Sequence, residues 1–177
     1  MNYQEFLKTK ELKSIEMGFD VDKNTLNDKM FNFQKDICAW ALKKGKSAVL
    51  IGCGCGKSLI QLEWAHRVNL HTNKNVLIIA PLSVVNQTYR EAQKFGIPNV
   101  NICRTQDDVK DGINITNYGM IEHFNTNEFI GVVLDESSIL KSFTSKTTAE
   151  FTDRFYATPY DNEKAQISLE DYFGLKV

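Results

Sequence analysis

Three short runs of aliphatic residues, separated by segments with helical spacing, constrain the fold of this chain more than any other feature of its sequence. The runs cover residues 48–51, 76–80 and 131–134. Short aliphatic runs without polar alternation are typical of strands that are buried on both faces of a sheet. Weaker strands are predicted at residues 100–103 and 113–116.

Helical patterns lie around and between these runs. Apolar residues recur at spacings of three and four from Phe33 until Gly45, and again within residues 58–70 and 83–95. Strands that alternate with helices form a parallel sheet whose helices cover both faces. We therefore predict an α/β fold built on one mainly parallel sheet.

The composition is that of an ordinary globular protein. Aromatic residues make up 11% of the 177 residues, which is too many for a disordered chain, and the formal net charge of -1 is not that of a strongly basic nucleic-acid-binding domain.

We expect a helical arm and loop over residues 1–30 and a single lobe over residues 31–177. Residues 1–13 lack the apolar run of a signal peptide, and no apolar stretch is long enough to span a membrane. We therefore expect a cytoplasmic protein with reduced cysteines.

A glycine-rich loop follows the first aliphatic run and precedes a helical pattern. It consists of Gly52-Cys53-Gly54-Cys55-Gly56-Lys57-Ser58, and its residues from Cys53 to Ser58 are predicted to bind a nucleotide. Glycines let backbone N–H groups close around phosphate oxygens, and the start of a helix adds the positive end of its dipole. We expect Lys57 to reach the β- and γ-phosphates and the Ser58 hydroxyl to ligate Mg²⁺. Ile51 stands where the strict Walker A pattern has its first glycine. The alternative is a glycine-rich turn before a helix that carries Lys-Ser.

Two adjacent carboxylates, Asp135 and Glu136, follow the third aliphatic run. Ligands of α/β sheets bind at the carboxyl ends of the strands. We expect Asp135 to hold Mg²⁺ through water and Glu136 to orient or deprotonate an attacking water. Alone, the pair is equally typical of a helix cap. Together with the glycine-rich loop it indicates nucleotide hydrolysis, with Lys57, Asp135 and Glu136 as catalytic residues.

The Cys53-x-Cys55 pair within the loop has a second possible role. A zinc site is disfavoured, because only one residue separates the cysteines and neither a second pair nor a histidine lies near them. We expect thiols in this loop to be open to alkylation, and we expect bound ATP to slow the reaction.

Six segments occur in the order of the motifs of superfamily 2 helicases, and the chain resembles that family over residues 31–174. The resemblance is particularly to Swi/Snf-type helicase-like proteins of phages and prophages, which places the expected cytoplasm in a bacterial or phage-infected cell. The matching segments are Gln34, Gly54-x-Gly56-Lys57-Ser58, Ala80-Pro81-Leu82, Thr116-Asn117-Tyr118, Asp135-Glu136-Ser137-Ser138 and Ala157-Thr158-Pro159.

The resemblance implies a P-loop NTPase: a RecA-like first motor lobe that binds ATP and Mg²⁺. It implies that Gln34 reads the adenine edge, although by its pattern alone this residue is a solvated helix residue. It further implies contacts to a nucleic-acid backbone, with DNA as the expected partner, and coupling to a second lobe. The residues that contact the backbone would be Pro81, Leu82, Thr116 and Asn117. By pattern alone these are strand-end and turn residues. The residues that couple the lobes would be Ala157, Thr158 and Pro159.

Two departures from the family pattern affect the expected activity. The sequence ends at Val177, whereas relatives continue into a second lobe that supplies an arginine finger. Such a finger contributes about 10³–10⁵-fold to turnover, so we expect slow hydrolysis alone, weak DNA binding and a protein partner that supplies or replaces the second lobe. The segment between Asp135 and Ala157 is short, and it leaves only Phe155-Tyr156 for the strand that enters the coupling motif.

Two other functions stay open. One is a non-motor interaction module on a helicase-lobe scaffold, which binds a host or phage protein. The other is a small P-loop phosphotransferase such as a nucleoside kinase, which the absence of a recognisable lid disfavours.

Overall fold

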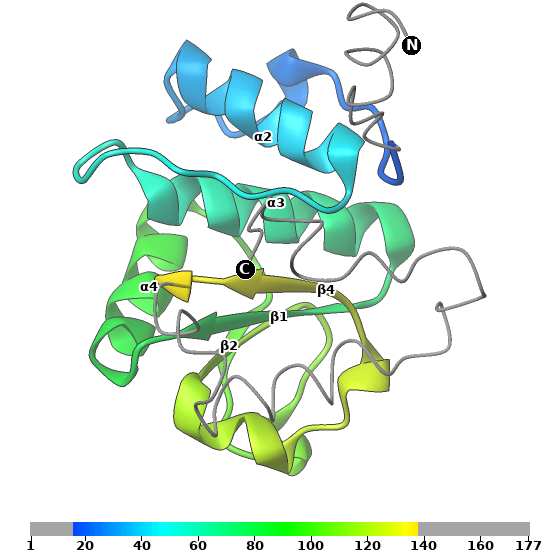
Figure 1. Ribbon diagram of the computed structural model, residues 1–177, viewed down its shortest axis with the longest axis vertical. Coiled ribbons are helices and arrows are strands. Elements are labelled where there is room, and N and C mark those ends of the chain that lie inside the picture. The colour runs from blue at the N-terminus through cyan, green and yellow to red at the C-terminus, as the bar shows by residue number, and fades with distance from the viewer. Residues whose placement is uncertain (1–15, 138–177) are drawn as a thin grey trace, which may run out of the picture.

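A computed structural model describes residues 16–137 of the chain (Figure 1). Two α-helices precede the first strand, a third follows it, and 3₁₀ helices lie between the later strands. The regular elements are η1 (Lys23–Thr25), α2 (Asn32–Lys44), α3 (Lys57–Thr72), β1 (Asn75–Ala80), α4 (Leu82–Phe95), β2 (Val100–Ile102), η2 (Gln106–Asp108), β3 (Ile113–Asn117), η3 (Tyr118–His123), η4 (Thr126–Glu128) and β4 (Phe129–Leu134), where η denotes a 3₁₀ helix.

The four strands form one parallel sheet in the order β2-β3-β1-β4. Ile78 in β1 lies opposite Ile115 in β3 and Val133 in β4, so β1 is central. This arrangement confirms the predicted α/β fold. Because all strands run the same way, the chain leaves β1, β3 and β4 at a single edge of the sheet, where ligands of such folds bind.

Side chains of β1 alternate between two hydrophobic cores, one on each face of the sheet. Val76 and Ile78 pack with residues of α2, α3 and α4. Leu77 and Ile79 pack on the opposite face, with residues of η3 among their neighbours. In Figure 1, α3 lies across the sheet and α2 lies over α3. Both faces of β1 are therefore covered, which explains why its residues 76–80 are all aliphatic.

The prediction of a buried strand at residues 48–51 is wrong. This segment, drawn between α2 and α3 in Figure 1, has no strand hydrogen bonding, and the side chain of Leu50 is 91% exposed. None of the four described strands pairs with it. Without a neighbouring strand, its backbone groups cannot join a ladder. Its side chains are covered only in part, because Ile51 packs against the core below α3 while Leu50 faces solvent.

The other predicted elements of residues 16–137 are confirmed. The helices predicted from Phe33, at 58–70 and at 83–95 correspond to α2, α3 and α4, and Gly45 ends α2 with a positive φ of 75°. Of the helical arm and loop predicted over residues 1–30, residues 16–30 contain η1 and residues 1–15 lie outside the described residues, as does everything predicted beyond Ser137. No helix within residues 16–137 is long and apolar enough to cross a membrane.

Candidate functional site

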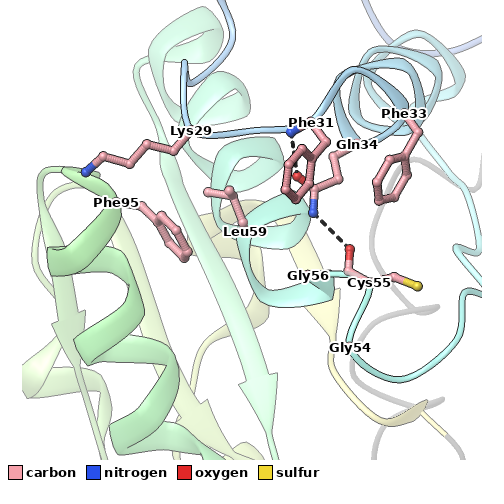
Figure 2. A pocket seen from close by; sticks show the side chains of 9 residues that line it. All are labelled: Lys29, Phe31, Phe33, Gln34, Gly54, Cys55, Gly56, Leu59 and Phe95. Atoms are coloured by element: carbon pink, nitrogen blue, oxygen red, sulfur yellow. Dashed lines mark hydrogen bonds between the residues drawn. The ribbon is translucent and has the colours of Figure 1, made fainter.

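A cavity of about 390 Å³ lies where the start of α2, the glycine-rich loop and the end of α4 meet. Figure 2 shows its lining, which is mainly apolar. Of the predicted nucleotide-binding residues, the structure brings Gln34 together with three residues of the loop. The lining residues are Lys29, Phe31, Phe33, Gln34, Gly54, Cys55, Gly56, Leu59 and Phe95.

Gln34 joins α2 to the glycine-rich loop. Its side-chain amide donates to the carbonyl oxygen of Cys55 at 2.9 Å, and its side-chain carbonyl accepts from the backbone N–H of Phe31 at 2.8 Å (Figure 2). The residue is only 4% exposed, so it is not a solvated helix residue. A glutamine amide has two N–H groups and its carbonyl has two lone pairs. Within the described residues, these two bonds leave one donor and one acceptor of Gln34 available.

Gly56 fixes the distance between the loop and Gln34. Its φ of 74° lies in the left-handed region, and a Cβ at this position would come within 2.3 Å of the Gln34 side-chain nitrogen. Both the backbone conformation and the space therefore require glycine. Gly56 is also the N-cap of α3, and it provides no side-chain cap. The first N–H groups of α3 thus have no capping side chain, which is the arrangement that binds anions at helix starts.

Lys57 and Ser58 form the first turn of α3, and both are half-buried. The ammonium of Lys57 donates to the carbonyl oxygen of Ile51 at 3.3 Å, so this side chain is folded back onto its own loop. Cys53, by contrast, is exposed. The loop therefore presents a cation and helix-start N–H groups from one short stretch of chain.

Hydrogen bonds fix the segment before α2 to two helices. The backbone N–H of Asn27 donates to the Glu63 carboxylate of α3 at 3.1 Å, and its side chain donates to the carbonyl oxygen of Phe95, at the end of α4, at 2.9 Å. The Glu63 side chain is 2% exposed and forms an ion pair with Arg67 at 2.7 Å. By its sequence Asn27 is a turn residue, and no contact between the segment of Asn27 and Glu63 was predicted. The spacing of Glu63 and Arg67, four residues apart on a predicted helix, could have predicted their ion pair.

Asp135 and Glu136 lie directly after β4, at the carboxyl edge of the sheet. The backbone N–H of Asp135 donates to Ile79 of β1 at 2.9 Å, and the Tyr118 hydroxyl donates to the carbonyl oxygen of Asp135 at 2.8 Å. Glu136 has a φ of 53°, which is uncommon for a residue with a side chain. Burial, and then the charges of Asp135 and Glu136, raise the pKa of Tyr118 above its ordinary value, so this residue is a neutral donor. Sequence reasoning missed its position beside the carboxylates.

The residues predicted to contact nucleic acid have different surroundings. Leu82 is 73% exposed at the start of α4, directly after the N-cap Pro81. Thr116 is buried in β3, and the side chain of Asn117 accepts from the backbone N–H of Gly119 at 3.0 Å. The coupling residues Ala157, Thr158 and Pro159 lie outside the described residues.

A magnesium ion would find few protein ligands here. Within residues 16–137, no group of three or more His, Cys, Asp or Glu side chains gathers to hold a metal. Mg²⁺ characteristically binds one or two carboxylates and completes its octahedron with phosphate oxygens and water. One carboxylate from Asp135 and the Ser58 hydroxyl fit this pattern if a phosphate supplies the remaining ligands.

Comparison with known proteins identifies the fold. No family model matches the sequence, and no curated protein matches it. The Sulfolobus solfataricus SWI2/SNF2 ATPase core in complex with dsDNA matches with a TM-score of 0.62 at 19% sequence identity, over 75% of this chain and 31% of that chain. The UvsW helicase from bacteriophage T4 matches with a TM-score of 0.57 at 14% identity, over 85% of this chain and 55% of that chain.

The fold is that of a RecA-like helicase lobe. The predicted RecA-like fold is thus confirmed, while the assignment to superfamily 2 and its phage and prophage refinement stay predictions. The chain spans about a third of one matching chain and about half of the other. At such low identities, the likeness concerns the fold alone.

Proposed function

We propose that this chain is the ATP-binding first motor lobe of a superfamily 2 helicase or DNA translocase, and that it hydrolyses ATP. The observation that carries the proposal is Gln34, which is buried in the cavity wall and bonded to the loop at Cys55. A lobe of this fold with a glutamine held against its glycine-rich loop has the parts needed to bind a base and its phosphates side by side.

The available donor and acceptor of Gln34 match the edge of adenine. Adenine presents an acceptor, N7, and a donor, the N6 amino group, whereas guanine presents two acceptors at the same positions. Gln34 would therefore hydrogen-bond adenine twice and guanine only once. Phe31 is 70% exposed and stacks with Phe33 at 6.1 Å between ring centroids, which supplies a flat apolar surface for a base.

The glycine-rich loop would hold the phosphates. Gly54 and Gly56 both have positive φ values, and they let the loop backbone turn its N–H groups toward an anion at the start of α3. Lys57 would exchange its contact with the Ile51 carbonyl for phosphate oxygens. Ser58 and Asp135 would hold Mg²⁺, which when bound supplies positive charge to the phosphates.

Glu136 would orient or deprotonate the attacking water. It is exposed, and it lies one residue beyond Asp135 at the carboxyl edge of the sheet. Tyr118 binds the carbonyl oxygen of Asp135, and this bond holds the turn that carries both carboxylates. The role of Glu136 is general-base catalysis, and that of Tyr118 is positioning.

DNA is the proposed track, and a second lobe is the proposed source of an arginine finger. The solved archaeal neighbour is in complex with dsDNA. Pro81 and the exposed Leu82 at the start of α4, with Thr116 and Asn117 at the end of β3, are the proposed contact region. Ala157, Thr158 and Pro159 are proposed to couple the lobes. With a formal net charge of -1, this lobe alone would bind DNA weakly.

Hydrolysis and binding of ATP, measured with and without single- and double-stranded DNA, test this function. Lys57→Ala should lower turnover about 10²–10³-fold, because it removes a donor to the transferring phosphate. Lys74→Ala is the matched control, since this exposed lysine follows the opposite end of α3. No ATP binding by the wild type at millimolar concentration would contradict the proposal.

One observation favours the alternative of a non-motor interaction module that binds a host or phage protein. Leu50 is 91% exposed in an aliphatic segment that pairs with none of the described strands. Large exposed apolar side chains, when they gather, mark protein interaction sites. Absence of nucleotide binding in the wild type, together with a folded chain by circular dichroism, would favour this alternative.

A further inference from the structure

The four cysteines of the chain fall into two pairs with opposite surroundings. Cys38 and Cys103 are buried in the two cores, at 0% and 2% exposure, and desolvation by burial raises the pKa of each thiol to about 12. Cys53 is exposed and Cys55 is half-buried in the glycine-rich loop. Only a thiolate reacts readily with disulfides and alkylating agents, so the two core thiols are inert near neutral pH.

The loop thiols lie on the candidate site itself. Cys55 lines the cavity, and its backbone carbonyl binds Gln34. Its sulfur is 4.0 Å from the carbonyl oxygen of Cys53, across a turn formed by Gly54. Gly54 has a φ of 80°, and within residues 16–137, apart from its two chain neighbours, no atom lies within 4 Å of the place where its Cβ would be. Figure 2 shows the Cys55 sulfur pointing away from Gln34. A reagent therefore has room to reach this turn.

We propose that Cys53 and Cys55 form a reversible thiol-modification site for low-molecular-weight disulfides, and that its modification closes the nucleotide site. The thiolate of Cys53 attacks one sulfur of the reagent, a protein–reagent S–S bond forms, the reagent's own S–S bond breaks, and the released thiolate takes up a proton. The Cys55 thiolate then attacks the Cys53 sulfur and releases the second thiol. The two cysteines lose two electrons, and the reagent gains them.

The effect on nucleotide binding rests on the proposed function. Phosphate binding needs the N–H groups between Cys53 and Ser58 to converge, and Gly54 gives the loop that freedom. A mixed disulfide would place a peptide-sized group beside the cavity, and a Cys53–Cys55 disulfide would restrict the turn at Gly54. Either product should weaken ATP binding about ten-fold or more, which corresponds to about 1.4 kcal/mol.

The experiment treats the reduced full chain with glutathione disulfide near neutral pH and maps the modified peptides by mass spectrometry. ATP affinity is measured before treatment, after it, and after dithiothreitol. Modification should occur at the loop peptide at least about ten times faster than at Cys38 and Cys103, saturating ATP should slow it, and dithiothreitol should restore the affinity. Cys38→Ala/Cys103→Ala should respond as the wild type does. In Cys53→Ser/Cys55→Ser the treated and untreated affinities should be equal.

Two results would overturn the inference while the proposed function stands. One is reaction of Cys38 or Cys103 at a rate comparable with the loop cysteines. The other is unchanged ATP affinity in protein whose loop is fully modified. If the reduced wild type binds no ATP, the proposed function fails, the claim that modification closes a nucleotide site fails with it, and the peptide map alone decides whether the loop is a modification site.

Discussion

The two parts of the proposed ATP site differ in how they are held. At the end proposed to bind the base (the base end), Gln34 is buried and bonded to the loop, and Asn27 and Glu63 tie the preceding segment to α3 and α4. At the end proposed to act in hydrolysis (the hydrolysis end), Asp135 and Glu136 follow β4, which is an edge strand of the described sheet and whose last residues are only half-buried. Buried polar groups that are hydrogen-bonded to other elements are held rigidly, whereas strand ends at a sheet edge have fewer neighbours.

If the proposed function holds, this difference predicts that nucleotide binding and hydrolysis are separable. Changes at the base end should alter affinity and base preference while the turnover of bound nucleotide is retained. Changes at the hydrolysis end should alter turnover while affinity is retained. Four substitutions test this separation.

Glu136→Gln should have the largest effect, and it should act on turnover. Removal of a general base lowers the rate about 10²–10⁴-fold, while an isosteric amide should leave ATP affinity almost unchanged. Single-turnover hydrolysis and equilibrium binding measure the two quantities separately. Glu122→Gln, at a half-exposed glutamate of η3, is the control. An equal loss of affinity and turnover would show that the two ends are not separable.

Gly56→Ala should weaken ATP binding about ten-fold or more. A residue with a side chain costs about 1–2 kcal/mol in the left-handed region, and the new methyl group would also displace Gln34. Gly96→Ala is a matched control, because Gly96 also has a positive φ, of 73°, but has open space around its Cβ position. The comparison fails if both variants lose the same affinity and the same free energy of unfolding.

Gln34→Ala should weaken ATP binding about ten-fold and remove the preference for ATP over GTP. The substitution breaks the bonds to Cys55 and Phe31, and a lost hydrogen bond of a buried group costs about 1–3 kcal/mol. Competition binding with ATP and GTP measures the preference. A preference for ATP that survives the substitution would mean that another group reads the base.

Tyr118→Phe should have the smallest effect. It leaves the carbonyl oxygen of Asp135 without its hydroxyl donor and should lower the free energy of unfolding by about 1 kcal/mol. Urea unfolding measures this change, and we expect turnover to fall more than affinity. A larger loss of affinity than of turnover would place Tyr118 with the base end instead.

Elements whose formation depends on local sequence pattern, such as β1 and α3, were predicted correctly from the sequence. The prediction failed where the structure depends on contacts with distant parts of the chain. Residues 76–80 and 48–51 are similar aliphatic runs, but only the first lies between two strands. Local periodicity does not reveal whether a neighbouring strand is present. The glycine-rich loop was identified from its own pattern of glycines before Lys-Ser, and Gln34 from the order of the motifs. Asn27 was not, because its bonds reach partners 36 and 68 residues away along the chain.

Calorimetric titration of the full chain with ATP and with GTP, in the presence of Mg²⁺, is the most direct test of an adenine nucleotide site read by Gln34. We expect ATP to bind about ten-fold more tightly than GTP, because Gln34 would make one more hydrogen bond to adenine. We also expect Lys57→Ala to weaken the binding of both nucleotides. Equal affinities for ATP and GTP would contradict the role of Gln34, and no binding of either nucleotide at millimolar concentration would contradict the nucleotide site itself.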